Sequence, residues 1–164
     1  MGIVESTYAE LKQQELKNNP YSCLHMADID INPHQIEAFT FALSSLELGG
    51  AILADEVGLG KTIEAGLVIK YLLCSGKDKI LLIMPSNLRK QWQVELEEKF
   101  DIDSLIVDSS NWEDYLTKVK SKQAVIIVSY HFASKRKAEF GKIAWDFCVF
   151  DIRMGQRWLT HYMN

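Results

Sequence analysis

The chain has 164 residues, of which 48% are hydrophobic and 24% are charged, and its formal net charge at pH 7 is −4. These values are typical of a single globular domain, exclude a disordered chain, and argue against a dedicated nucleic-acid-binding module, which is usually basic. No run approaches the roughly 18 apolar residues of a membrane span, and no secretory signal is visible, so we expect a cytoplasmic protein that does not enter a membrane.

Two helices are predicted in the first third of the chain. Residues 1–19 contain many strong helix formers and are followed by Pro20, which would end an N-terminal helix. A second helix is expected to begin at Asn32, which can cap it, with Pro33 at the first helical position. The apolar face of this second helix would consist of Ile36, Phe39, Ala42, Leu43 and Leu46.

The next stretch has the order strand, glycine-rich loop, Gly-Lys-Thr and helix, which is how proteins build a cradle for a nucleoside triphosphate. Backbone N–H groups of such a loop and the positive end of the helix dipole face the phosphates. Lys61 would reach the outer phosphates, and the Thr62 hydroxyl would bind Mg²⁺. The general pattern has glycine where this chain has Asp55. The candidate nucleotide-binding residues of the loop are Asp55, Glu56, Val57, Gly58, Leu59, Gly60, Lys61 and Thr62.

Upstream of the loop, Gln35 carries an amide that can donate and accept hydrogen bonds at once, as the edge of an adenine demands. Most glutamines at a helix start are simply solvated, and only the loop downstream favours a role for this one in nucleotide binding.

Short apolar runs in the rest of the chain alternate with helices. The strands are predicted at residues 79–84, 103–107, 124–129 and 145–151, and the longest helix, at residues 88–100, carries apolar residues four positions apart. This alternation predicts right-handed βαβ units and an α/β fold, in which helices flank a parallel sheet in three α/β/α layers.

Ligands of such folds bind at the carboxyl ends of the strands. The Asp55–Thr62 loop, residues 85–87 and Asp151 all fall at that edge. A Mg²⁺ site needs a carboxylate at the end of a buried strand, and Asp151 follows two apolar residues there. The alternative is a surface aspartate that only closes the strand, and the loop upstream favours the metal-binding role.

Residues 55–66 (DEVGLGKTIEAG) resemble motif I of the Swi/Snf-type translocases of helicase superfamily two, which also carry Asp at the first loop position. Their Glu-Val and Glu-Ala-Gly forms are most similar to the bacterial RapA-like branch, which recycles RNA polymerase. Further stretches resemble the adenine-recognition element, motif Ia, motif Ib and the run into motif II: residues 33–35, residues 85–92 with Glu95, residues 129–130, and residues 145–151. The resemblance covers residues 20–151 and implies a RecA-like lobe that binds ATP and Mg²⁺.

The resemblance stops after Asp151. The family continues with Glu-Ala-His or Glu-Gly-His, whereas this chain continues with Ile152-Arg153-Met154, so the general-base glutamate is missing. A second lobe, which supplies the arginine finger, does not fit into this length. We therefore expect an incomplete lobe over residues 20–151, truncated at motif II, with an atypical tail over residues 152–164. Such a chain would bind nucleotide without hydrolysing it alone, and an exposed sheet edge would favour self-association.

The parent protein implied by the resemblance uses ATP to move along double-stranded DNA in the bacterial cytosol or nucleoid, with RNA polymerase as a further partner. The motif Ia and Ib residues that would contact DNA are Ser86, Asn87, Arg89 and Tyr130. The lysines of residues 118–122 and the basic residues 135–137 could add phosphate contacts or be solvated helix faces. Two other functions stay open: another phosphate-loop ATPase or kinase domain, and a nucleotide-dead interaction module, for example for RNA polymerase.

Overall fold

The computed structural model describes residue 19, residue 22 and the ranges 31–46, 61–118 and 124–151. Almost all of the predicted N-terminal helix, the predicted strand before the phosphate loop, the loop itself up to Gly60, and the tail after Asp151 lie outside the described residues. None of the helices among the described residues combines the length and the apolar composition of a membrane span.

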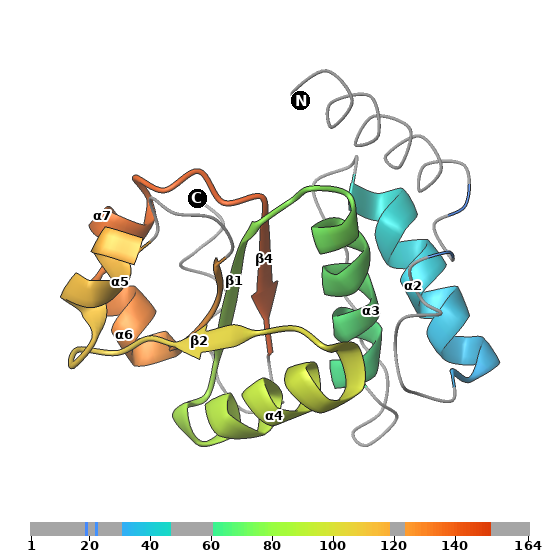
Figure 1. Cartoon of the computed structure of the whole chain (residues 1–164), viewed down its shortest axis with the longest axis horizontal. Helices are drawn as coiled ribbons and strands as arrows, with labels where there is room; N and C mark the ends of the chain where they lie inside the picture. The colour runs from blue at the N-terminus through green and yellow to red at the C-terminus, as the bar shows by residue number, and fades with distance from the viewer. Residues whose placement is uncertain (1–18, 20–21, 23–30, 47–60, 119–123, 152–164) are drawn as a thin grey trace, which may run out of the picture.

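Four parallel strands form one sheet in the order β2-β3-β1-β4, as Figure 1 shows. β1 pairs with β3, with Lys79 opposite Ala124, and with β4, with Ile80 opposite Phe147. Two strands have the bounds that the apolar runs predict, and the other two are shorter than predicted. The strands are β1 (Lys79–Met84), β2 (Ser104–Ile106), β3 (Ala124–Ser129) and β4 (Phe147–Phe150).

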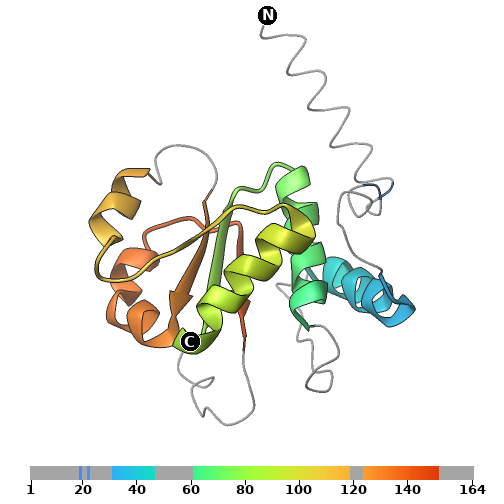
Figure 2. The ribbon, with the colours of Figure 1, turned by 60° about the horizontal axis from the view of Figure 1, so that its bottom comes forward.

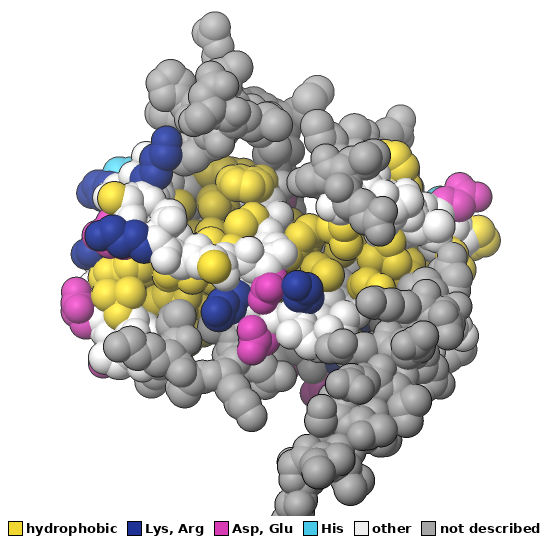
Figure 3. Space-filling view, turned by 90° about the horizontal axis from the view of Figure 1, so that it is seen from above, with side chains coloured by type: hydrophobic (Ala, Val, Ile, Leu, Met, Phe, Trp, Pro, Cys, Tyr) yellow, Lys and Arg dark blue, Asp and Glu magenta, His cyan; other side chains and the backbone are white. Residues whose placement is uncertain are grey.

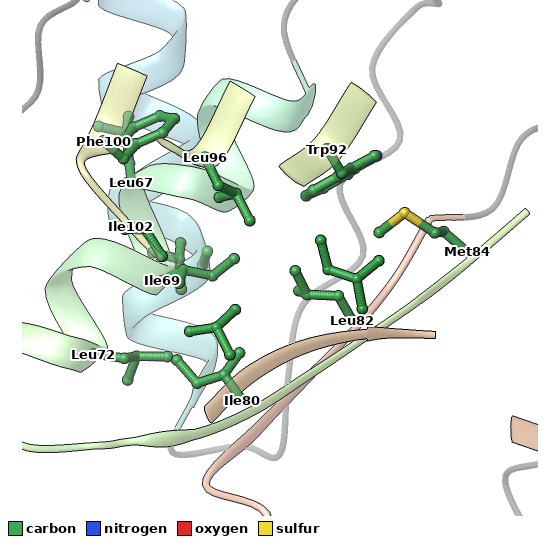
Figure 4. Close-up of a cluster of buried hydrophobic side chains, with 14 of the residues drawn as sticks. Leu67, Ile69, Leu72, Ile80, Leu82, Met84, Trp92, Leu96, Phe100 and Ile102 are labelled. Carbon is green, nitrogen blue, oxygen red and sulfur yellow. The ribbon is translucent and has the colours of Figure 1, made fainter. Parts of the chain in front are cut away.

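Helices cover both faces of this sheet, so the predicted three-layer α/β/α arrangement is confirmed. Ile80, Leu82 and Met84 of β1 belong to one core cluster with side chains of α2, α3 and α4. Figure 4 labels the members from β1, α3 and α4. Leu81 and Ile83 point to the other face and belong to a second cluster with α5, α6 and α7. The helices are α2 (Pro33–Leu46), α3 (Lys61–Cys74), α4 (Arg89–Phe100, after the short 3₁₀ helix Ser86–Leu88), α5 (Trp112–Lys118), α6 (Tyr130–Lys135) and α7 (Lys137–Phe140).

The buried face of α2 is rotated by about one residue relative to the apolar face that the sequence predicts. Phe39 and Ala42 are buried as expected, but Ile36 is 37% exposed, and the polar residues Gln35 and Ser45 are buried instead. Local hydrogen bonds make this possible, because the Ser45 hydroxyl donates to the Phe41 carbonyl (2.8 Å) and the Gln35 Oε1 accepts from a backbone N–H of the same helix end. Polar groups satisfied within their own helix can be buried at low cost.

The apolar stripe predicted for the helix at residues 88–100 is confirmed at all four of its positions, the last three of which lie in α4. Leu88, Trp92, Leu96 and Phe100 are each at most 5% exposed. At the end of this stripe Phe100 lies against Gly66 of α3, so closely that a Cβ at position 66 would come within 2.3 Å of the Phe100 Cε2 atom. The glycine therefore lets α3 and α4 approach each other at this point.

At the edge where β1 begins, Asp146 ties β4 to β1. Its Oδ2 accepts hydrogen bonds from the N–H groups of Asp78 (3.2 Å) and Lys79 (3.1 Å), and the Lys77 ammonium lies 3.6 Å from Oδ1. Burial raises the pKa of Asp146, but the N–H groups of Lys79 and Asp78 and the charge of Lys77 together outweigh it, so the pKa is lowered. Figure 3 looks onto this edge and shows basic and acidic side chains between hydrophobic ones.

Candidate nucleotide-binding site

The N-terminus of α3 and the carboxyl ends of β1 and β4 lie at the same edge of the molecule, as Figures 1 and 2 show. Lys61 and Thr62 are the first two residues of α3, and both are half-buried. Free backbone N–H groups and the positive end of the dipole make a helix start a favourable place for phosphate groups. The remaining loop candidates, residues 55–60, lie outside the described residues.

Asp151 is held at this edge by three hydrogen bonds from three different elements. Its N–H donates to the Ile83 carbonyl at the end of β1 (3.0 Å), which continues the pairing of β4 by one residue. Its Oδ2 accepts from the Trp92 Nε1–H of α4 (3.0 Å), and its carbonyl accepts from the Tyr130 hydroxyl at the start of α6 (3.0 Å). Hydrogen bonds therefore fix both the backbone and the side chain of Asp151, the residue that the sequence predicts to bind the metal.

Trp92 is the residue of this site whose role the sequence does not reveal. Its spacing predicts a core position, and the side chain is indeed only 3% exposed. A buried indole usually needs an acceptor for its N–H group, so a tryptophan in an apolar stripe signals that such an acceptor exists. The sequence cannot say that the acceptor is Asp151, because that residue is 59 positions away.

Tyr130 is a DNA-contact candidate whose hydroxyl already has an intramolecular partner in Asp151. Desolvation, and to a lesser extent the negative charge of Asp151, raise the pKa of Tyr130 to about 12. The hydroxyl therefore stays protonated at neutral pH and remains a hydrogen-bond donor.

Gln35, the adenine-recognition candidate, is 3% exposed. Its Oε1 accepts a hydrogen bond from the N–H of Asn32 (3.0 Å), three residues earlier. This is half of a capping box, in which a Gln or Glu at the third helical position satisfies the N–H of the capping residue. The structure thus gives Gln35 a local role in the start of α2 beside the role that the sequence suggests.

The other DNA-contact candidates surround the carboxyl end of β1. Ser86 and Asn87 are exposed on the 3₁₀ helix that follows β1. Arg89 is half-buried, and its Nε donates to the Ser86 carbonyl (3.3 Å). Hydrogen bonds from Ser110 lower the pKa of Asp108, and the positive charge of Arg89 adds a smaller contribution in the same direction.

Arg136, the central residue of the basic run at residues 135–137, contacts other side chains of the same domain. The Arg136 guanidinium lies 5.2 Å from the centre of the Trp112 ring and pairs with Glu139 at 3.0 Å. Lys135 and Lys137 on either side are exposed. Arg136 therefore packs on an aromatic ring of the second core cluster while its side chain stays 33% exposed.

The residues present fit Mg²⁺ bound together with a nucleotide. Across the described ranges no group of three or more His, Cys, Asp or Glu side chains could hold a metal ion by itself. Mg²⁺ does not require such a group, since it keeps several waters and usually takes one or two protein oxygens together with substrate phosphates. The Thr62 hydroxyl and the Asp151 carboxylate, at one edge of the sheet, match this requirement in kind and number.

Comparison with known proteins gives a consistent result. The SNF2-related domain matches this chain over residues 34–152. RNA polymerase-associated protein RapA of Yersinia enterocolitica is 33% identical over 146 residues, which are 85% of this chain and 15% of that protein. The RapA protein of Yersinia pestis is 30% identical over 153 residues, covering 89% of this chain and 16% of that protein. The chain therefore spans less than a fifth of the length of these relatives.

Among solved structures, the fold resembles the SWI2/SNF2 ATPase core of Sulfolobus solfataricus, determined in complex with double-stranded DNA. The match has a TM-score of 0.64 and 24% sequence identity, and it covers 76% of this chain and 26% of that chain. This similarity concerns the fold.

Proposed function

Because the chain belongs to the SNF2-related domain family and forms the N-terminal, RecA-like lobe of a Swi/Snf-type ATPase, we propose that it binds ATP together with Mg²⁺ at the edge formed by α3, β1 and β4. The observation that carries the proposal is the placement of Lys61 and Thr62 at the start of α3, at the same edge as Asp151. The loop residues Asp55 to Gly60 and Gln35 complete the proposed site.

Each residue of this site has a distinct part in the proposal. The α3 N-terminus attracts the phosphates, and the Lys61 ammonium neutralises their outer negative charges. Thr62 and Asp151 would hold Mg²⁺, which supplies further charge neutralisation on the phosphates when it is bound. Gln35 would direct its amide to the adenine, and its Oε1 already accepts the N–H of Asn32.

Titration of Mg-ATP by calorimetry tests the proposal. We expect saturable binding to the chain and at least about a tenfold loss of affinity in Lys61→Ala, because a charge-assisted contact to phosphate is worth roughly 1.5–3 kcal/mol. Lys142→Ala is the matched control, since Lys142 is exposed between α7 and β4 and carries the same charge. Equal affinities of the chain and Lys61→Ala would contradict the proposal.

We further propose that this chain does not turn over ATP by itself. The residue after Asp151 is Ile152, whose apolar side chain cannot accept a proton from an attacking water. Hydrolysis should therefore stay at the background rate with and without double-stranded DNA. DNA-stimulated hydrolysis that disappears in Lys61→Ala would show that another group acts as the base.

Double-stranded DNA is the proposed substrate of the complete protein. The proposed contacts are the exposed Ser86 and Asn87, together with Arg89 and Tyr130.

RNA polymerase is a second proposed partner, favoured by the relatives that are named RNA polymerase-associated. Capture of purified bacterial RNA polymerase by the chain, in the absence of measurable ATP binding, would favour the alternative that the chain is an interaction module that does not bind nucleotide. A bacterial cytosol or nucleoid location follows from either partner.

A further inference from the structure

We propose that Trp92 and Tyr130 are positioning residues that hold the Asp151 carboxylate in the orientation in which it binds the hydrated Mg²⁺ of Mg-ATP. This inference rests on the proposed nucleotide site and adds two residues to it. Both act through Asp151 and neither is placed in contact with the nucleotide. The contacts of Asp151 with α4 and α6 carry the argument.

The first step concerns the freedom of the carboxylate. An aspartate that follows the last residue of a strand can normally turn about its χ1 and χ2 bonds. Here Oδ2 of Asp151 is fixed by the indole of Trp92, while Oδ1 accepts no hydrogen bond from the described part of the chain. The bond therefore leaves one oxygen of the carboxylate available to a water on a metal ion and fixes the direction in which that oxygen points.

The second step concerns the rigidity of the donor. Trp92 is 3% exposed and packs in the core cluster between α4 and the sheet, beside Met84 (Figure 4). Its ring cannot follow a carboxylate that moves, because the interior around it is close-packed. Tyr130 restrains the backbone of Asp151 in the same way from α6. Partners of this kind, which orient a metal-binding carboxylate, commonly change metal affinity by one to two orders of magnitude when they are removed.

Trp145 is a second tryptophan whose indole N–H has an acceptor in the described part of the chain, and it provides the comparison. The Nε1–H of Trp145 donates to the backbone carbonyl of Phe140 (3.1 Å), five residues earlier, within the second core cluster. That bond satisfies a partly buried donor locally, and its acceptor is an uncharged backbone carbonyl. Trp92→Phe and Trp145→Phe therefore remove the same indole N–H and the same ring volume, but only the first substitution releases Asp151.

The experiment measures ATP affinity with Mg²⁺ and with EDTA in the chain, Trp92→Phe, Tyr130→Phe and Trp145→Phe. We expect Trp92→Phe to reduce the gain in affinity from Mg²⁺ by about tenfold and Tyr130→Phe to reduce it less, with affinity in EDTA unchanged. Trp145→Phe should behave like the unsubstituted chain. Equal Mg²⁺ dependence of all variants, in a chain whose ATP binding requires Lys61, would overturn this inference and leave the proposed function intact.

A second measurement needs no core substitution and covers the case in which Trp92→Phe does not fold. Mn²⁺ takes oxygen ligands in the same octahedral geometry as Mg²⁺ and broadens nearby proton resonances. With ATP and Mn²⁺, the indole N–H resonance of Trp92 should disappear while that of Trp145 persists, and Asp151→Asn should restore it. Equal broadening of the two resonances would overturn the inference. Absence of any Lys61-dependent ATP binding would instead refute the proposed function, and this inference with it.

Discussion

At the scale of single residues, Gln35 is the position at which a structural and a binding role meet. Its Oε1 completes the N-terminal cap of α2 through the N–H of Asn32. Adenine recognition would draw on the same amide, so the protein without nucleotide already holds the side chain in one orientation. The role in α2 can be measured separately, in the absence of nucleotide.

Replacement of Gln35 by alanine should lower the free energy of unfolding by about 1 kcal/mol, because the N–H of Asn32 loses its partner. Urea denaturation without nucleotide measures this change. Glu37→Ala is the control, since Glu37 is exposed in the same turn and its loss should change stability by less than about 0.5 kcal/mol. Equal stabilities of the two variants would show that the capping bond contributes nothing in solution.

Thr62 and Asp151 are predicted site residues whose placement at one edge follows from the sequence. Each comes next to an apolar run, and the carboxyl ends of parallel strands share an edge. Trp92 could be predicted only as a core residue. Its bond to Asp151 depends on how α4 lies across the sheet, which spacing along the chain does not determine.

At the scale of elements, the contact between α3 and α4 depends on the absence of a side chain at Gly66. Gly66 faces the ring of Phe100, and a Cβ there would lie 2.3 Å from Cε2 and 2.5 Å from Cζ. The ring is fully buried, and protein interiors are close-packed, so it cannot easily turn away from an added Cβ.

Gly66→Ala should therefore destabilise the protein by about 1–2 kcal/mol, since overpacking costs more than the gain of about 1 kcal/mol in helix propensity. Thermal or urea unfolding measures the difference. The same substitution in a Phe100→Leu background should cost much less, because leucine has no atoms at Cε2 and Cζ. Additive effects of the two substitutions would exclude this contact as the cause.

The strands and helices differ in how well the sequence predicts them. β1 and β3 are buried on both faces, so their continuous apolar runs mark their bounds without ambiguity. The face of α2 was predicted wrongly at Ile36, because hydrophobic spacing does not account for polar side chains that satisfy themselves within a helix. Gln35 and Ser45 are buried for that reason.

At the scale of the whole molecule, the alternation of strands and helices predicts the three layers, but it does not predict the order of the strands. β1 lies between β3 and β4, and both of these come later in the chain. β4 therefore joins the sheet through a single described neighbour, and the contacts at its two ends, at Asp146 and Asp151, matter for the stability of the whole lobe.

The stability of the lobe should depend on pH through Asp146. Its pKa in the folded protein is lower than in the unfolded chain, so its ionised form stabilises the fold above the unfolded pKa of about 4, and this contribution disappears as the pH falls through the folded value. Urea denaturation of the chain and of Asp146→Asn should show a difference at pH 7 that shrinks below about pH 4. A difference that stays constant over this range would contradict the assignment.

The attachment of β4 at both ends also has a mechanical consequence. Tension applied at Asp151 along the axis of β4 would pull the strand past β1. In that direction the ladder bonds to β1, the Asp146 contacts with Asp78 and Lys79, and the Asp151 bond to Ile83 all bear load together. Tension across the strand would instead break them one at a time, so we expect the attachment of β4 to resist axial force better than peeling.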